Sequence, residues 1–439
     1  MMRAPRWLSS VRHAAGKVFK PVPDVVTVDA PDQHEVLDMI ASIGVALLDS
    51  NSATSEVIST LVDIAGAYKL GDIQIVVFPT AVIVQHTGGD YRAEIKATDG
   101  SAVRLDQIGA LDELTKQARL GTIAPSDLME SLRNVLQSKP RFGPWLMVLG
   151  HTILTLGFGF MLNPTLNALP IYIGLGLAVG ALILLGQKIP TLAVAMPVFA
   201  AFTATALTAL FFADWAGESP LRVITPALIS FLPGMLLTVA AIELTTGQVI
   251  SGATRLVYGT AQLVLLAFGV AAGFAIVGTI PAHEATANNL GVWTPLVGIT
   301  LLAIGYTLFF SAPKGASVWL LLSLLVTYSA QSIGTVIIGA ELSSFVGALV
   351  VIPFARLASR FKTAPPAAVL TLASYWILVP GALGFLSLDA AKTSAAQSLQ
   401  GLISTGLSMF AIALGILVSN AITENVISVA KRRRLRAGA

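Results

Sequence analysis

The pattern of apolar and polar positions divides the chain at about residue 142. Before this point, apolar residues recur at helical spacing or in short β-branched runs, separated by polar stretches. After it, long apolar stretches follow one another with short breaks, each near the ~20 residues that a helix needs to cross a bilayer. Charge follows the same division, because residues 1–142 hold 14 of the 27 Lys and Arg and 17 of the 24 Asp and Glu residues. We therefore expect a soluble first third followed by a multi-span membrane part.

The soluble third predicts an α/β domain over residues 33–142. Helical spacing of apolar residues appears in residues 33–50, and a second helix begins near "SATSEV", with Ser52 as its N-cap. β-branched runs interrupted by turn residues then predict antiparallel strands in residues 72–98. Two amphipathic helices complete the domain, in residues 105–138.

Ten apolar stretches in the remainder predict ten membrane-spanning helices. They are residues 145–164, 170–187, 190–212, 222–243, 256–280, 293–312, 316–336, 341–358, 366–387 and 400–423. A helix-breaking Pro-Gly pair stands inside two of these spans: Pro233-Gly234 in the fourth and Pro380-Gly381 in the ninth, 147 residues apart. The same break at matching positions indicates an internal repeat of five spans.

Five is an odd number, so two five-span copies must face opposite ways across the membrane. We therefore expect two inverted repeats, over residues 143–291 and 292–430, as in many secondary transporters. Substrate sites in such proteins lie near the bilayer midplane at broken helices, whose freed backbone groups suit a zwitterionic ligand. A packing kink without a ligand is the alternative reading of each Pro-Gly pair.

Basic residues predict the orientation. With the N-terminal domain in the cytoplasm, the inner loops hold six Lys and Arg residues and the outer loops hold two, which obeys the positive-inside rule. The inner set is Lys188, Arg255, Lys314, Arg356, Arg360 and Lys362, and the outer set is Arg222 and Lys392. Residues 431–439 then form a basic cytoplasmic tail, and residues 1–32 a basic tail or a helix on the membrane surface.

Few side chains offer chemistry. The chain has no cysteine, and no recognisable catalytic, nucleotide-binding or metal-ligand motif, so we expect no enzyme, no cofactor and no metal site.

Ionisable groups within spans are costly and therefore suggest function. Candidates for proton coupling or gating are Glu243, Arg255, Glu341 and His151, with interfacial or loop positions as the alternatives. Candidates for substrate binding are Pro233, Gly234, Pro380, Gly381, Gln262 and Gln331, the two glutamines being equally able to bond neighbouring helices.

The chain resembles the threonine/serine exporter family over about residues 35 to 430. The resemblance rests on "ISFLPGMLLTVAAIELTTGQVISGATRLVYG" (229–259), "LASYWILVPGALGF" (372–385) and the N-terminal "IGVALLDSNSATSEV" and "ALDELTKQARLGTIAPSDLMESL". It implies export of threonine, serine and similar small amino acids across the bacterial cytoplasmic membrane, driven by the proton-motive force.

Two other functions stay open at the level of sequence. One is a channel for small solutes, which the same repeat would allow. The other is a receptor or regulator that acts through the soluble domain, although a single span would suffice as its anchor. Homo-oligomerisation is also open, and nothing suggests a nucleic-acid partner.

Overall fold

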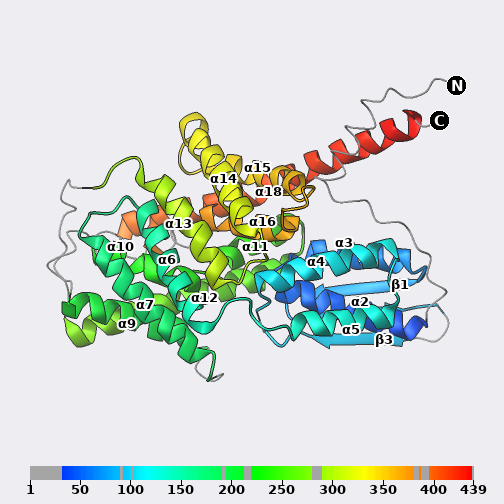
Figure 1. Cartoon of the computed structure of the whole chain (residues 1–439), viewed down its shortest axis with the longest axis horizontal. Helices are drawn as coiled ribbons and strands as arrows, with labels where there is room; N and C mark the ends of the chain where they lie inside the picture. Colours follow the sequence, from blue (N-terminus) through cyan, green and yellow to red (C-terminus); the bar gives the residue numbers. More distant parts are fainter. Residues whose placement is uncertain are drawn as a thin grey trace.

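The computed structural model describes residues 32–88, 92–100, 102–189, 194–211, 219–278, 289–378, 385–386 and 395–437, without the side chains of 395–398 and 424–437. Pro380 and Gly381, the second predicted break, lie outside the described residues, as does nearly all of the predicted basic segment 1–32. Figure 1 shows an elongated molecule with the α/β elements at one end and a bundle of helices at the other.

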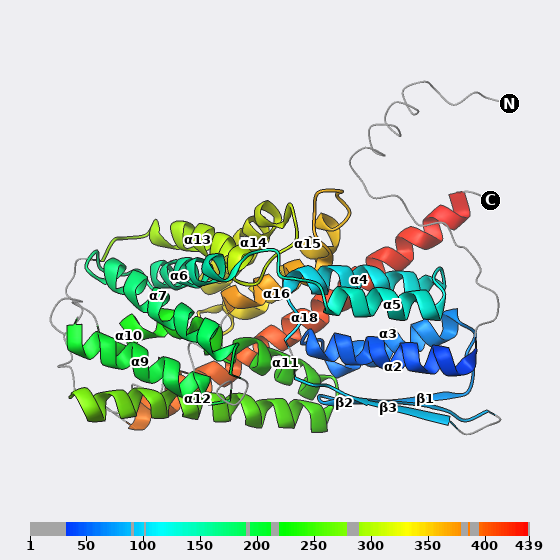
Figure 2. The ribbon, with the colours of Figure 1, turned by 60° about the horizontal axis from the view of Figure 1, so that its bottom comes forward.

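The N-terminal α/β part is built as the sequence pattern predicts. Its three-stranded antiparallel sheet has the order β1-β2-β3, and four helices pack on one side of it. In Figure 2 the sheet, the pair α2 and α3, and the pair α4 and α5 form three successive layers. The elements are α2 (Gln33–Asp49), α3 (Thr54–Ala67), β1 (Ile73–Phe78), β2 (Ala81–His86), β3 (Arg92–Ala97), α4 (Leu105–Leu120) and α5 (Pro125–Leu136).

Strand alternation explains the layering. On β2, Val82 and Val84 are fully buried, whereas on β3 Ile95 is 66% exposed. Successive side chains of a strand point to opposite faces, so one face of the sheet packs on α2 and α3 and the other is uncovered. The hydrophobic core between sheet and helices is separate from the cores of the helical bundle.

Each of the ten predicted spans overlaps a helix of the structure. Among the described residues, five helices are long and apolar enough to cross a membrane, one bent pair passes the same test together, and four apolar helices are shorter. The helices are α6 (Pro144–Met161), α7 (Ala168–Gly186), α9 (Met196–Phe211), α10 (Pro220–Ile224) with the 3-10 helix η1 (Thr225–Phe231) and α11 (Gly234–Thr245), α12 (Val249–Val277), α13 (Thr294–Phe309), α14 (Ala316–Ile338), α15 (Ser343–Ala358), α16 (Ala367–Leu378) and α18 (Ala395–Ala437).

The outer surface of the bundle is apolar. Val257, Val264 and Phe268 on α12 are about two-thirds exposed, at 69%, 59% and 63%. Apolar surface on this scale does not remain in water in a soluble monomer. The long apolar helices together with this surface make the chain a polytopic membrane protein.

Helices α6 and α13 pack tightly along two pairs of glycines. A Cβ atom on Gly157 would lie 2.9 Å from the carbonyl oxygen of Gly298, and one on Gly305 would lie 2.9 Å from that of Gly150. The order along α6 is thus reversed along α13, so the two helices are antiparallel. Gly298 lies 148 residues after Gly150, and Gly305 lies 148 residues after Gly157. Gly150 therefore packs against the residue that corresponds to Gly157, and Gly157 packs against the residue that corresponds to Gly150.

Two helix pairings recur in the two predicted halves. Helices α6 and α7 pack together as α13 and α14 do, and α9 packs on α12 as α15 packs on α18. Helix α18 continues into the predicted tail, and its end projects outward from the body of the molecule (Figures 1 and 2).

Candidate functional site

The predicted break at Pro233-Gly234 is a sharp bend in the fourth predicted span. The segment formed by α10 and η1 ends at Phe231, α11 begins at Gly234, and their axes differ by 65°. Pro233 stands at the N-cap of α11 with φ −78° and ψ 36° and contributes no N–H. The first backbone N–H groups of any helix have no intrahelical partner, and within the described residues no side chain caps α11.

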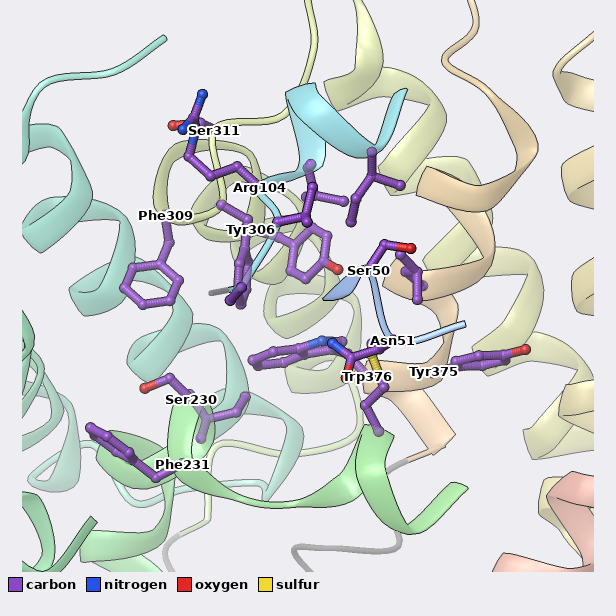
Figure 3. Close-up of a pocket in the computed structure, with 18 of the residues that line it drawn as sticks. Ser50, Asn51, Arg104, Ser230, Phe231, Tyr306, Phe309, Ser311, Tyr375 and Trp376 are labelled. Carbon is purple, nitrogen blue, oxygen red and sulfur yellow. The ribbon is translucent and has the colours of Figure 1, made fainter. Parts of the chain in front are cut away.

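A cavity of about 770 Å³ lies between this break and the α/β part. Its volume is in the range of small-molecule sites. Figure 3 shows Ser230 and Phe231 of the break together with lining residues of other elements, among them Asn51 and Trp376. The main lining residues are Ser50, Asn51, Val103, Arg104, Met147, Gln187, Ile229 to Leu236, Gln262, Tyr306, Phe309, Phe310, Leu372, Tyr375 and Trp376.

One wall of the cavity is aromatic. Tyr306 and Phe310 both meet Trp376 edge to face, with ring centroids 5.5 and 5.3 Å apart. Phe309 also meets Phe310 edge to face, with the ring centroids 4.8 Å apart. Such a rigid wall presents ring faces that suit aliphatic groups and an ammonium ion.

His151 lies behind the break, and its side chain is fully buried. Its role in proton coupling or gating stays a prediction. Its Nδ1 lies 3.1 Å from the carbonyl oxygen of Gly176, and its Nε2 lies 3.0 Å from Oγ of Ser230. Gly176 permits this approach, because a Cβ there would lie only 2.8 Å from Cα of Thr152 on α6.

Glu243 and Arg255 form a buried ion pair that contacts the α/β part. Arg255 Nε lies 3.2 Å from Glu243 Oε2, outside the geometry of a hydrogen bond, and the residues are 7% and 0% exposed. Oε1 of Glu243 accepts the backbone N–H of Thr54 at 2.9 Å, and an Arg255 Nη2 donates to the carbonyl of Ser52 at 3.4 Å. The pair thus joins the corner between α11 and α12 to the start of α3.

This contact also corrects a predicted helix cap. Ser52 is not the N-cap of α3, since that position belongs to Ala53, which has no side-chain acceptor. The carboxylate of Glu243, 189 residues further on, accepts a first-turn N–H instead. A negative group at a helix N-terminus stabilises the helix. The N-terminus of α3 therefore has this stabilising carboxylate only when α3 is docked against the membrane helices.

The other predicted site residues are divided. Gln262 of α12 lines the cavity together with Pro233 and Gly234. Gln331 lies elsewhere, where its Nε2 donates to Ser344 Oγ at 3.3 Å, as the helix-bonding alternative predicts. Glu341 is exposed in the turn before α15 and accepts a bond from Ser404 Oγ at 3.0 Å. Its role in proton coupling stays a prediction.

Several lining residues escaped the sequence pattern. Ser50 and Asn51 end α2, and Arg104 precedes α4, where it pairs with Asp106 at 3.1 Å. Beside them, partial burial and the nearby Asp99 raise the pKa of Asp49 to about 6. In the sequence these residues are marked only by their position in short polar loops between helices. Most loops are polar, so this position does not single them out. Within the described residues, no group of three His, Asp or Glu side chains is placed to hold a metal ion.

Comparison with known proteins decides the family. The model of the family described as "Putative threonine/serine exporter" matches residues 38–277, more than half of the chain. The chain belongs to this family. The match covers the α/β part and the first five predicted spans, whereas the resemblance predicted from sequence extended to about residue 430.

Individual relatives are distant. A "Probable threonine/serine exporter" of Mycobacterium tuberculosis is 24% identical over 232 residues, which are 52% of this chain and 44% of that protein. "Pheromone-regulated membrane protein 10" of Candida albicans is 27% identical over 228 residues, 50% of this chain and 20% of that protein. The chain thus matches less than half the length of these curated relatives. No solved structure matches it.

Proposed function

We propose that this protein is a secondary exporter of threonine and serine, and that the cavity at the Pro233-Gly234 break is its substrate site. The observation that carries the proposal is the position of the break, which forms part of the cavity wall. Irregular backbone at membrane depth is tolerated where it lines a cavity, and transporters bind substrates at such breaks.

The cavity suits a small zwitterion. The first N–H groups of α11 have no side-chain cap and carry the positive end of the helix dipole, so they are partners for a carboxylate. The aromatic wall of Tyr306, Phe310 and Trp376 supplies ring faces for the ammonium and the aliphatic carbons. Together these groups favour an amino acid over a simple anion or an apolar solute.

In alternating access, the two halves would act as inverted repeats related by an axis at the α6–α13 contact, which we call the α6–α13 seam. Gly150 packs against Gly305, and Gly157 packs against Gly298. Because Gly298 lies 148 residues after Gly150 and Gly305 lies 148 residues after Gly157, this antiparallel packing supports a twofold relation between the halves. In this proposal the second half moves against the first around the cavity, as in other repeat-built transporters. The proposal includes ten membrane-spanning helices, five in each half.

The α/β part would lie in the cytoplasm and act on the inner mouth of the cavity. Basic residues support this side: Arg255 contacts Ser52, and Arg141 donates to the carbonyl of Ala312, next to Lys314. Arg222, assigned to the outside, contacts the carbonyl of Asn163 at 3.2 Å at the opposite end of α6. The Glu243–Arg255 pair would then be the gate contact, formed when the α/β part is docked.

Efflux of labelled threonine tests the function. Cells preloaded with radiolabelled threonine through a dipeptide should lose it faster with this protein than without it, because the exporter adds a route. A protonophore should abolish the protein-dependent part, because secondary export draws on the proton gradient.

Two outcomes would contradict the proposal in different ways. Protein-dependent efflux that ignores the protonophore would favour a channel. No protein-dependent efflux of threonine or serine, with the protein shown to be in the membrane, would refute the substrate and leave the fold unaffected.

A further inference from the structure

His151, which lies behind the break, determines whether Ser230 in the cavity wall donates or accepts the hydrogen bond between them. Nδ1 of His151 lies 3.1 Å from the carbonyl oxygen of Gly176. A carbonyl oxygen only accepts hydrogen bonds, so Nδ1 must carry a proton. In a neutral imidazole the other nitrogen, Nε2, is then an acceptor.

The neutral form is the one that the surroundings favour. His151 is fully buried, and its contacts within the described residues are Gly176, Ser230 and the ring of Phe309 at 5.3 Å. None of these is a carboxylate that would stabilise an imidazolium. A charged group buried without a counter-ion is strongly disfavoured.

Ser230 must therefore donate its hydroxyl proton to Nε2 of His151, 3.0 Å away. A hydroxyl has one proton and two lone pairs, so once the proton points at His151 only lone pairs are available to the cavity. Ser230 lines that cavity, as Pro233 does, and Figure 3 shows it next to Phe231. This part of the wall consequently accepts hydrogen bonds and does not donate them.

The fold itself does not require these polar groups. Residues at the offset of the two halves are Ile299, 148 after His151, Leu324, 148 after Gly176, and Ile377, 147 after Ser230. All three are at most 6% exposed and belong to one apolar core. At these positions the second half has apolar side chains, whereas the first half has the hydrogen-bonded series Gly176–His151–Ser230, which ends at the cavity. Packing alone does not need these hydrogen bonds, so we assign them to the cavity.

We infer that Ser230, oriented by His151, selects amino acids whose side chain bears a hydroxyl, by accepting a hydrogen bond from that hydroxyl. This inference rests on the proposed function and specifies its selectivity. A methyl group in place of the hydroxyl would face the lone pairs of Ser230 without offering them a hydrogen bond, which is costly. Valine, which replaces the hydroxyl of threonine by a methyl group, is the matched analogue.

Competition binding on the purified full chain tests the inference. Unlabelled threonine should displace radiolabelled threonine at a concentration roughly 10- to 100-fold lower than valine. In Ser230→Ala this ratio should fall to within about threefold, because the acceptor is lost. His151→Phe, which keeps a ring but no nitrogen, should lower the ratio in part, because Ser230 is then free to turn. Ser408→Ala, a buried serine bonded to Ser344 at 2.9 Å and outside the cavity wall, should keep the wild-type ratio.

The outcomes separate the inference from the proposed function. Binding of threonine with equal competition by valine, or an unchanged ratio in Ser230→Ala, would overturn the inference and leave the exporter intact. The equal case would mean that Ser230 receives the ammonium, which both amino acids share. No saturable binding of threonine to the wild-type protein would overturn both.

Discussion

Replacing Glu243 by alanine should lower the free energy of unfolding by about 3–5 kcal/mol, the cost of removing one member of a buried ion pair. The substitution leaves Arg255, only 7% exposed, without its counter-ion. It also leaves the N–H of Thr54 without its acceptor. Thermal unfolding of the purified protein in detergent measures the effect.

Matched variants identify the source of that loss. Glu243→Gln keeps an acceptor for Thr54 and should lose less than the alanine variant. The double variant Glu243→Leu with Arg255→Met removes both charges and should recover much of the stability, because no unpaired charge remains. Glu341→Ala, at an exposed carboxylate, should change stability by less than about 1 kcal/mol. A Glu243→Ala protein as stable as wild type would contradict a stabilising role of the Glu243–Arg255 pair between the α/β part and the membrane helices.

Replacing Gly157 by valine should prevent α6 and α13 from packing. The Cβ atom alone would lie 2.7 Å from the backbone nitrogen of Leu302, and backbone atoms cannot yield as a side chain can. We expect a loss of about 3 kcal/mol or more, at the upper end of overpacking effects. Size-exclusion chromatography of a fluorescent fusion should show little monodisperse protein.

Gly174→Val is the control for this substitution. A Cβ on Gly174 of α7 would meet no atom within 4 Å, so the same change in a membrane helix should leave the elution profile as in wild type. Equal yields of monodisperse protein from both variants would contradict the α6–α13 seam.

Periodicity and length were enough to predict the elements of this fold. Each predicted span overlaps a helix, and the order of helices and strands in the α/β part is confirmed. These features depend on local composition, which the sequence shows directly. The bend at Pro233 was equally visible, because proline acts on its own helix.

Contacts between distant residues could not be read from the pattern. Glu243 reaches Thr54 across 189 residues, and His151 reaches Ser230 across 79. Serine gives no periodic signal, and Ser230 differs from its neighbours only as a polar residue in an apolar stretch. Ser52 looked like an N-cap on local grounds, but tertiary packing supplied the acceptor from Glu243 instead.

Filling the cavity tests the central claim most directly. Gln262→Trp places a large ring in the cavity wall, whereas Val264→Trp, two residues along α12 and 59% exposed, places the same ring on the outer surface. The measurement is the initial rate of labelled threonine efflux from preloaded cells with equal amounts of each variant in the membrane. The rate should fall roughly tenfold or more in Gln262→Trp, because the ring displaces the substrate, and remain near wild type in Val264→Trp. Wild-type efflux through Gln262→Trp would show that threonine does not pass through this cavity.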